Sequence, residues 1–446
     1  MSFHAVVIGC GADSLVAAHL LARAGRQVLV IEERPAAAQD FGWVPPQIVA
    51  ELDLALQIQA PDPWATALLG DGGRLELWRD MRRTCESLKR FSERDAQRWP
   101  EFCRRMAALA RVFEALYTEP PAEPLSLRLA LRVRGLGREG MTDLLRVLPM
   151  SVAELLDDWF ECDALKGALG AMGILNIRQG PRSGGTAFRF LHHHVGSPAG
   201  VFRPPRSNVS SLLRQRPGIY VNPSGVARIR IRGGRADGVV LDNGDEIGAP
   251  MVISGVDPCR SLLELADAAW LDPELARAIG NIRCHGVAAR ISFDASMQGN
   301  TVLAPSLDYL ERAYDEVKYG RVSRAPYLEA HPAPQGVEVH FQYVPQQGNG
   351  DLAATVRRLL PGVEDAQARV LYPGDLQREE GWPQGQPYHA ELALDQALWM
   401  RPLPELAQYQ TPIDGLWLCG PATHPGGGIA GASGYNCARA ILKEKR

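Results

Sequence analysis

The sequence predicts an α/β protein, and two glycine-rich segments near opposite ends of the chain carry most of that prediction. The first is VVIGCGADSLVAAHLL, residues 6–21, in which an apolar run precedes a Gly-x-Gly turn. The second is GLWLCGPATHPGGGIAGASGYNCARAIL, residues 415–442. At 446 residues, the chain is long enough for two to three domain equivalents.

The first segment has the order of a dinucleotide-binding unit. Residues 3–8 are predicted to form a buried strand, 15–24 a helix that Gly25 ends, and 27–31 a second strand. Glu32 closes that strand 23 positions after Gly9, near the spacing expected of a ribose-binding acid. The segment therefore predicts a Rossmann-type nucleotide site.

Each position of this turn has its own requirement. Gly9 permits the tight turn, and Gly11 lets backbone N–H groups approach a pyrophosphate at the positive end of the helix. The third position of the fingerprint needs only a small residue, which Ser14 supplies. Glu32 disfavours a 2′-phosphate, because two negative charges would be adjacent. The predicted phosphate-binding residues are Gly9, Gly11, Ala12, Asp13 and Ser14.

The second segment predicts a strand over 416–419, a glycine-rich loop, and a terminal helix from Ala432. Exposed backbone of this kind can lie against a planar, polar ring at a helix start. The alternative is a structural loop that packs on the first unit. Residues 135–140 match Gly-x-Gly-x-x-Gly literally, but they follow an Arg-rich helical pattern rather than a strand, so we do not expect a second nucleotide site there.

Several segments resemble the phytoene-desaturase-like amine-oxidase superfamily, within the glutathione-reductase-type FAD flavoproteins. They are RRTCESLKRFSERDAQRWPEF (82–102), SVAELLDDWFECDALKGAL (151–169), GPRSGGTAFRFLHHH (180–194), ADGVVLDNGDEIGAPMVISGVDP (236–258) and LDQALWMRPLPELAQYQTPIDGLWLCGPATHPGGG (394–428). The resemblance implies an α/β fold with a glutathione-reductase-type FAD-binding Rossmann domain and an interleaved α+β substrate domain. The implied FAD domain comprises 1–60, 206–290 and 391–446, and the implied substrate domain 61–205 and 291–390.

The resemblance also implies which residues bind a noncovalent FAD. The N-terminal turn would hold the pyrophosphate, Glu32 the adenosine ribose, and a strand near Val226 the adenine. The terminal helix would direct its N-terminus at the N1–O2 edge of the flavin, where its dipole stabilises an anionic reduced ring. The further residues implied in cofactor binding are Glu33, Arg34, Gly420, Gly427, Gly428, Ile429 and Ala430.

The implied function is that of an FAD-dependent oxidoreductase acting on an apolar, chain-like or lipid-like substrate. Hydride would pass between flavin N5 and a C–C or C–heteroatom bond, with NAD(P)H, quinone or oxygen as external donor or acceptor. Two departures from the family pattern, a lone Gly42 after the ribose acid and PPRSNVSSLL in place of a Gly-Gly-Met segment, keep an alternative open. That alternative is a flavoprotein-derived scaffold that binds a lipid or partner without turnover.

His424 is the candidate catalytic residue, because it lies inside the predicted flavin loop and could move a proton. The alternative is that it holds the loop by hydrogen bonding. His192, His193 and His194 are adjacent and cannot all face one ion, so we expect no metal site, although one of them could face the substrate.

Composition restricts the partners. A net charge of −3 disfavours nucleic acid. The absence of a long apolar run and of a signal peptide, together with eight scattered cysteines, predicts a cytoplasmic protein. The Arg-rich segment 126–146 alternates arginine with leucine and could contact a membrane peripherally, the alternative being a solvated face paired to Glu139 and Asp143.

Overall fold

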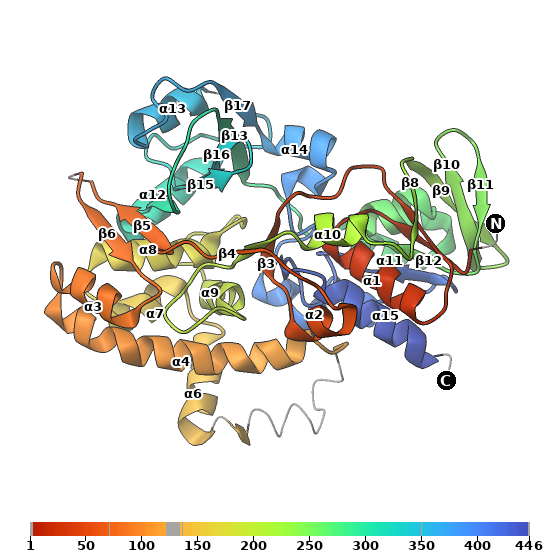
Figure 1. The fold of residues 1–446 in the computed structure, drawn as a ribbon, viewed down its shortest axis with the longest axis horizontal. Helices are drawn as coiled ribbons and strands as arrows, with labels where there is room; N and C mark the ends of the chain where they lie inside the picture. Colours follow the sequence, from red (N-terminus) through yellow and green to blue (C-terminus); the bar gives the residue numbers. More distant parts are fainter. Residues whose placement is uncertain (1–2, 71, 122–133, 136, 349, 445–446) are drawn as a thin grey trace.

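The computed structural model describes residues 3–70, 72–121, 134–135, 137–348 and 350–444. Within these ranges, the strands form four sheets of five, three, seven and four strands. Figure 1 shows both chain ends beside the five-stranded sheet, with the long helix α4 (Glu93–Tyr117) along the opposite half. The observed class is therefore a mixed α/β fold.

The five-stranded sheet is wholly parallel and contains the predicted nucleotide unit. Its order is β18-β12-β1-β2-β8, from Leu416–Leu418, Val252–Ser254, Ala5–Ile8, Val28–Ile31 and Tyr220–Asn222. Helices α1 (Ala12–Arg23), α10 (Val209–Gln215) and α15 (Ala432–Glu444) pack together on one side. Because both faces are covered, β1 and β2 are buried at every position. The strand–turn–helix–strand prediction is confirmed.

A three-stranded antiparallel sheet covers the other side of the parallel sheet, as their shared apolar cluster shows. It comprises β9 (Val226–Arg232), β10 (Arg235–Leu241) and β11 (Glu246–Gly248). After β12 the chain forms the π-helix η1 (Arg260–Leu265), the 3₁₀ turn η2 (Ala268–Trp270) and α11 (Pro273–Gly280).

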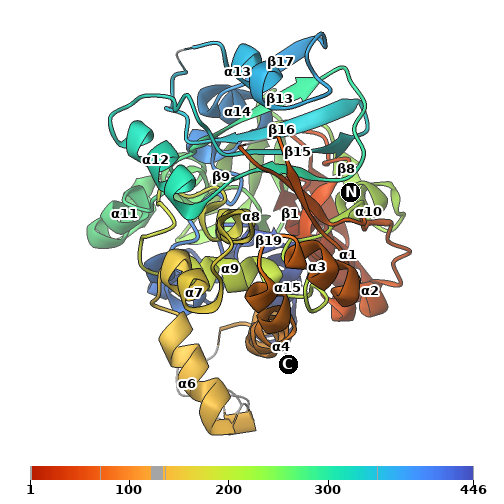
Figure 2. The same cartoon turned by 90° about the vertical axis from the view of Figure 1, so that its left-hand side faces the viewer.

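A seven-stranded sheet forms a separate layer, at the top of Figure 2. Its order is β17-β13-β16-β15-β14-β5-β6, and only the β14–β5 pair is parallel. The strands span Ala368–Leu371, Ala288–Phe293, Gly336–Gln342, Leu328–Ala333, Thr301–Leu303, Ala65–Leu68 and Arg74–Leu77. The boundary expected after residue 290 falls inside β13.

The helices around this sheet are α12 (Leu307–Lys318), α13 (Leu352–Leu359) and α14 (Pro373–Glu380). Four short 3₁₀ turns lead back to β18. They are η3 (Pro383–Gly385), η4 (Leu394–Gln396), η5 (Leu398–Met400) and η6 (Pro404–Leu406).

A narrow four-stranded strip joins the ends of the chain. Its order is β19-β3-β7-β4, from Gly428–Ile429, Asp40–Trp43, Arg206–Ser207 and Ile58–Gln59. Helix α2 (Pro46–Leu52) follows β3. The strip therefore places the C-terminal glycine loop directly beside an N-terminal segment.

The remaining helices form a lobe with an aromatic core that includes Trp99, Phe102 and Phe202. They are α3 (Met81–Lys89), α4, α6 (Gly137–Val147), α7 (Val152–Trp159), α8 (Asp163–Ile174) and α9 (Thr186–His194). Capping fixes two of the starts: Ser92 accepts from the Asp95 N–H, and Ser151 forms a capping box with Glu154.

Helix α6 extends away from the body of the molecule, at the lower left of Figure 2. Arg128 and Arg132 of the Arg-rich segment lie outside the described residues. Asp143 pairs with Arg105 of α4 at 3.2 Å, and Arg146 with Asp158 at 2.7 Å. No helix in the described part of the chain is both long and apolar enough to cross a membrane.

Candidate functional site

The turn after β1 leaves backbone donors open. Gly9 has φ +100°, and its N–H donates to the Ile31 carbonyl at 2.9 Å. Helix α1 begins with Gly11 as its N-cap, without a side-chain cap, and a Cβ at Gly11 would meet no atom within 4 Å. The first N–H groups of α1 therefore face open space at the positive end of a helix, an arrangement that suits a pyrophosphate.

Ser14 occupies the third position of the fingerprint, and a glycine on a neighbouring strand provides the space that its side chain needs. Its side chain is buried, and its Oγ lies 1.9 Å from where a Cβ on Gly255 would stand. Gly255 follows β12, and its N–H donates to the Ile8 carbonyl at 2.8 Å. The close approach of helix and sheet is thus preserved by a glycine on the neighbouring strand, which no local motif predicted.

Asp13 points at the terminal helix. Its Oδ1 accepts from the backbone N–H groups of Ser433 at 3.1 Å and Gly434 at 3.4 Å. Burial raises the pKa of Asp13 to about 7. A Cβ at Gly434 would lie 1.7 Å from the Asp13 carbonyl oxygen, so the two helices meet at their N-terminal turns. Two of the N–H groups expected to face a flavin are therefore already bound by Asp13.

Glu32, at the end of β2, forms a two-point ion pair with Arg214 of α10. Arg214 Nε donates to Oε1 at 2.9 Å and Nη2 to Oε2 at 2.7 Å. The Arg214 guanidinium holds the pKa of Glu32 below its usual range. Ionised oxygens with lone pairs to spare can still accept from ribose hydroxyls. Val226 begins β9 four residues after β8, the strand that pairs with β2.

Glu33 and Arg34 face a different set of partners. Glu33 accepts from Arg34 at 2.8 Å and also pairs with Arg260 at 2.5 Å. The Arg34 guanidinium packs against Gly381, where a Cβ would lie 2.7 Å from Nη1. The structure therefore connects this part of the predicted motif to η1 and to the end of α14, and its contact with a cofactor remains a prediction.

The lone Gly42 is where the N-terminal segment meets the C-terminal loop. Gly42 pairs with Gly428 and Trp43 with Ile429 in the parallel β3–β19 ladder. Gly42 has φ +128°, and a Cβ there would lie 2.3 Å from the Gly428 carbonyl oxygen. The Ala430 N–H donates to the Trp43 carbonyl at 2.8 Å. A single glycine at 42 is thus required by a close backbone approach.

Gly420 ties the C-terminal loop to the sheet. It has φ +109°, and a Cβ there would lie 2.6 Å from the Gly255 carbonyl oxygen. Its N–H donates to Ser433 Oγ at 3.0 Å. The predicted cofactor residues of the two chain ends are therefore brought together around Gly255.

Two histidines of α9 lie beside the loop and are held neutral, and one of them, His192, hydrogen-bonds to it. His192 Nε2 lies 2.8 Å from the Gly427 carbonyl and must donate, so its Nδ1 accepts from the Tyr117 hydroxyl at 2.8 Å. His193 Nδ1 donates to the Met172 carbonyl at 2.7 Å, and its Nε2 accepts from the Tyr388 hydroxyl at 3.0 Å. Burial lowers the pKa of His192 to about 3 and that of His193 well below its usual value.

His194 points away from the loop, toward the Val201 carbonyl at 2.9 Å. No cluster of three or more potential metal ligands occurs among the described residues. The sequence pattern could not have separated the three histidines, because their partners lie in different segments. Those of His192 come from α4 and the C-terminal loop, those of His193 from α8 and Tyr388, and that of His194 from the residues after α9.

His424 is buried between the loop and helix α4. Its Nε2 donates to the Leu116 carbonyl at 3.1 Å, while Nδ1 has no hydrogen-bond partner in the described part of the chain. Burial lowers the pKa of His424 to about 4. These contacts suit a residue that fastens the loop to α4, and its predicted role in proton transfer remains a prediction.

A fully buried arginine, Arg401, supports the same loop and was not predicted. Its guanidinium donates to backbone carbonyls, including Pro421 at 2.6 Å and Tyr388 at 3.0 Å. A Cβ on Gly426 would lie 2.9 Å from Arg401 Nε, which has no partner among the described residues. Burial lowers the pKa of Arg401 to about 9, so it remains cationic at neutral pH. This buried positive charge suits an anionic ring edge nearby.

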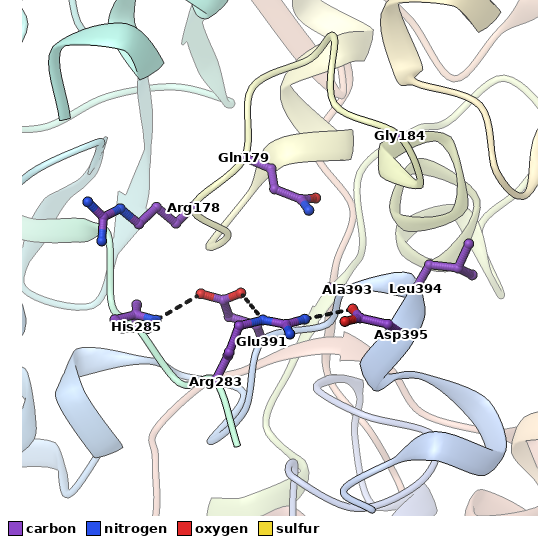
Figure 3. Close-up of a pocket in the computed structure, with 9 residues that line it drawn as sticks. All are labelled: Arg178, Gln179, Gly184, Arg283, His285, Glu391, Ala393, Leu394 and Asp395. Carbon is purple, nitrogen blue, oxygen red and sulfur yellow. Dashed lines mark hydrogen bonds and ion pairs between the residues drawn. The ribbon is translucent and has the colours of Figure 1, made fainter. Parts of the chain in front are cut away.

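A cavity of about 650 Å³ is lined in part by residues between 391 and 395 and contains four charged side chains and a histidine. Figure 3 shows Glu391 between Arg283 and His285. Arg283 lies 3.5 Å from Glu391 and 2.6 Å from Asp395, and His285 lies 3.4 Å from Glu391. Arg283 and His285 lie against the two acids, Arg178 is not drawn in an ion pair with either acid in Figure 3, and the two arginines balance the two carboxylates in formal charge.

No protein-family model matches the chain. Pyridine nucleotide-disulfide oxidoreductase domain-containing protein 2 of Rattus norvegicus is 26% identical over 99% of this chain and 94% of its own length. A limonene dehydrogenase polypeptide of Castellaniella defragrans is 25% identical over 98% of this chain and 94% of its own. A lycopene-forming phytoene desaturase of Paracoccus sp. is 26% identical over 47% of each chain.

Solved structures share the fold over the whole chain. A putrescine oxidase variant aligns with a TM-score of 0.59 at 15% identity, covering 99% of both chains. Cyclohexylamine oxidase of Brevibacterium oxydans aligns with a TM-score of 0.56 at 15% identity, covering 100% of both.

The site and the curated relatives support an FAD-dependent oxidoreductase, the class that the sequence resemblance implied, and the solved amine oxidases share the fold. Within that class, the chain is similar over nearly its full length to pyridine nucleotide-disulfide oxidoreductase domain-containing protein 2.

The residues present fit FAD. The uncapped start of α1 suits the pyrophosphate and the ionised Glu32 a ribose, while the Tyr388 ring already packs on Gly427, 2.0 Å from where a Cβ would stand. Bound FAD supplies a hydride donor or acceptor. The chain's own residues fix the loop through His192 and Arg401 and keep a neutral Tyr388–His193 pair beside it.

Proposed function

We propose that the protein transfers hydride between flavin N5 and a C–C or C–heteroatom bond of an apolar, chain-like substrate. One observation carries this proposal: the N-terminal turn and the C-terminal glycine loop, from opposite ends of the sequence, meet around Gly255, Asp13 and Gly434. A glutathione-reductase-type FAD domain needs that meeting, because its cofactor spans both segments.

The proposed FAD domain comprises 1–60, 206–290 and 391–446, and the proposed substrate domain 61–205 and 291–390. The five- and three-stranded sheets draw their strands from the first set of ranges. The seven-stranded sheet draws its strands from the second, apart from the first three residues of β13.

We propose that the phenol of Tyr388 faces the substrate where it meets the flavin. A Cβ on Gly428 would lie 3.7 Å from its hydroxyl, which donates to His193 Nε2. Burial raises the pKa of Tyr388 to about 12, so the phenol stays protonated at neutral pH. It can therefore orient substrate or water by hydrogen bonding without carrying charge.

Anaerobic titration of the purified holoprotein with NADH or NADPH tests the direction of the reaction. Bleaching of the flavin absorbance assigns a reductase that takes electrons from a nicotinamide. A spectrum that stays oxidised, but bleaches with an oxidisable chain-like substrate such as a terpene, assigns a dehydrogenase with quinone or oxygen as acceptor. Failure of every reductant to change a bound flavin would contradict hydride transfer and favour the scaffold.

A further inference from the structure

A second cavity, of about 390 Å³, lies between the four-stranded strip and the seven-stranded sheet. Phe41 of β3 and Arg206 of β7 contribute from the strip, and Glu329 of β15 contributes from the sheet. Phe41 directly precedes Gly42, the partner of Gly428, and its ring lies 6.4 Å from that of His193. The cavity is therefore adjacent to the glycine loop proposed to hold the flavin.

Much of the lining is apolar, from Ala60, Pro61, Val201 and several prolines. Its charged members are three arginines and one glutamate. Glu329 is already neutralised: Oε1 lies 3.1 Å from Arg203 Nε, and Oε2 accepts from the Tyr327 hydroxyl at 2.7 Å. A net positive charge remains on the wall of this cavity, in contrast to the balanced cavity around Glu391.

Arg206, on strand β7 of the strip, contributes part of this excess positive charge. It pairs with Phe41 in the β3–β7 ladder, and its guanidinium carbon lies 5.4 Å from the Phe41 ring centre. Nη2 donates to His331 Nδ1 at 3.2 Å, which leaves His331 Nε2 to donate toward Glu338, 3.4 Å away. Among the described residues, no carboxylate forms a direct salt bridge with Arg206 within 4.0 Å.

A second residue of the lining, Trp64, carries an unpaired donor among the described residues. Trp64 is buried at 1% exposure, and its indole Nε1 has no hydrogen-bond partner in the described part of the chain. An unpaired buried donor is unfavourable, so a ligand acceptor that reached it would be favoured. The lining therefore combines a guanidinium that has no carboxylate partner with an indole N–H that has no acceptor, both among the described residues.

We propose that this cavity binds the carboxylate end of a chain-like substrate, with Arg206 as the residue that recognises it. The planar guanidinium matches the two oxygens of a carboxylate, and the apolar lining accommodates the first part of the chain. The remaining chain would extend along β3 toward Gly428. This inference rests on the proposed function and makes its substrate class an apolar chain that ends in an acid, rather than a neutral hydrocarbon.

Binding of decanoate, decan-1-ol and decyl phosphate to the holoprotein tests the assignment. Isothermal titration calorimetry gives each Kd, and the flavin absorbance is recorded separately to establish that FAD is bound. We expect decanoate to bind at least tenfold more tightly than decan-1-ol. The preference should disappear in Arg206→Gln and be reduced in Arg206→Lys.

Arg178→Gln is the matched control, because it removes the same charge from the lining of the other cavity. It should leave the preference for decanoate unchanged. Equal binding of acid and alcohol, or a preference that survives Arg206→Gln in a flavin-loaded protein, would overturn the proposal. Tighter binding of decyl phosphate than of decanoate would overturn the carboxylate assignment in favour of a phosphate. A protein without flavin would instead count against the proposed function.

Discussion

Ser14 on helix α1 packs directly against Gly255 at the end of strand β12, with its hydroxyl oxygen 1.9 Å from the position of a Cβ on that glycine. The fingerprint usually has a glycine at position 14, which lets the helix approach the sheet. Here the helix carries a serine, and the glycine that makes room for it is Gly255 on the neighbouring strand. Gly255 also lies against Gly420, where a Cβ would be 2.6 Å from its carbonyl oxygen. Because Gly255 has no side chain, the N-terminal turn and the C-terminal loop can both pack against it.

Gly255→Ala should therefore destabilise the protein by about 1–3 kcal/mol, the usual cost of overpacking, and reduce the FAD content. Ser14→Gly alone should be tolerated, and combined with Gly255→Ala it should restore part of the loss. Thermal unfolding and the FAD-to-protein ratio of the two single variants and the double variant measure this coupling. Purely additive effects would contradict direct packing.

Gly42→Ala should disrupt the pairing of β3 with β19, which joins the N-terminal segment to the C-terminal loop. The added Cβ would lie 2.3 Å from the Gly428 carbonyl oxygen, and the residue would keep a strained φ of +128°. Gly218→Ala is the control, since Gly218 has φ +114° but a Cβ added there would meet no atom within 4 Å. Strain alone costs about 1–2 kcal/mol, so Gly42→Ala should cost more than Gly218→Ala and also lose FAD. Equal losses in the two variants would argue against the close approach.

The stability of the protein should fall as pH rises from about 4 to about 7 through the titration of Asp13. Its folded pKa is raised to about 7 from 3.8, so the folded state holds this proton more tightly than the unfolded state. Stability from this group is fully present below the unfolded pKa and is lost as pH passes the folded pKa.

Asp13→Asn should remove this contribution to the pH dependence, because an amide oxygen can still accept from Ser433 and Gly434 without carrying charge. We expect the variant to gain stability over the native protein at pH 8 and to lose that gain at pH 4. Denaturant unfolding at several pH values provides the comparison. A difference between the two proteins that does not vary with pH would show that Asp13 does not titrate in this range.

Helix α6 offers a surface that suits an anionic membrane. Leu145 is 70% exposed and Met141 41%, and they share the helix with the exposed Arg138 and Arg146. We propose peripheral contact through the 126–146 segment on this basis. Leu145→Asp should weaken sedimentation with vesicles that contain phosphatidylserine, whereas Tyr319→Asp, at an exposed aromatic side chain on another helix end, should not. Identical sedimentation of both variants and the native chain would contradict the contact.

The sequence predicted the nucleotide unit well because local patterns determine it. A short apolar strand, a glycine turn and a spaced acid lie close together in the chain, and the observed β1, α1 and β2 follow that order. The C-terminal glycine loop was found for the same reason. Both signals are local in sequence and need no knowledge of partners.

The supporting residues could not be predicted, because their roles depend on distant segments. Gly255 is one glycine among 44, and only packing against Ser14 distinguishes it. Arg401 resembles any surface arginine in sequence, yet it is fully buried beneath Gly426. The positive cavity around Arg206 combines a strand of the strip with a strand of the seven-stranded sheet. No periodicity reveals such long-range contacts.

The FAD content of the purified protein, measured from its visible spectrum and from the flavin released on denaturation, tests the cofactor assignment most directly. We expect an oxidised-flavin spectrum and one noncovalent FAD per chain, which denaturation without proteolysis should release. A colourless protein that cannot be reconstituted with added FAD would contradict the assignment of the two glycine segments to one cofactor.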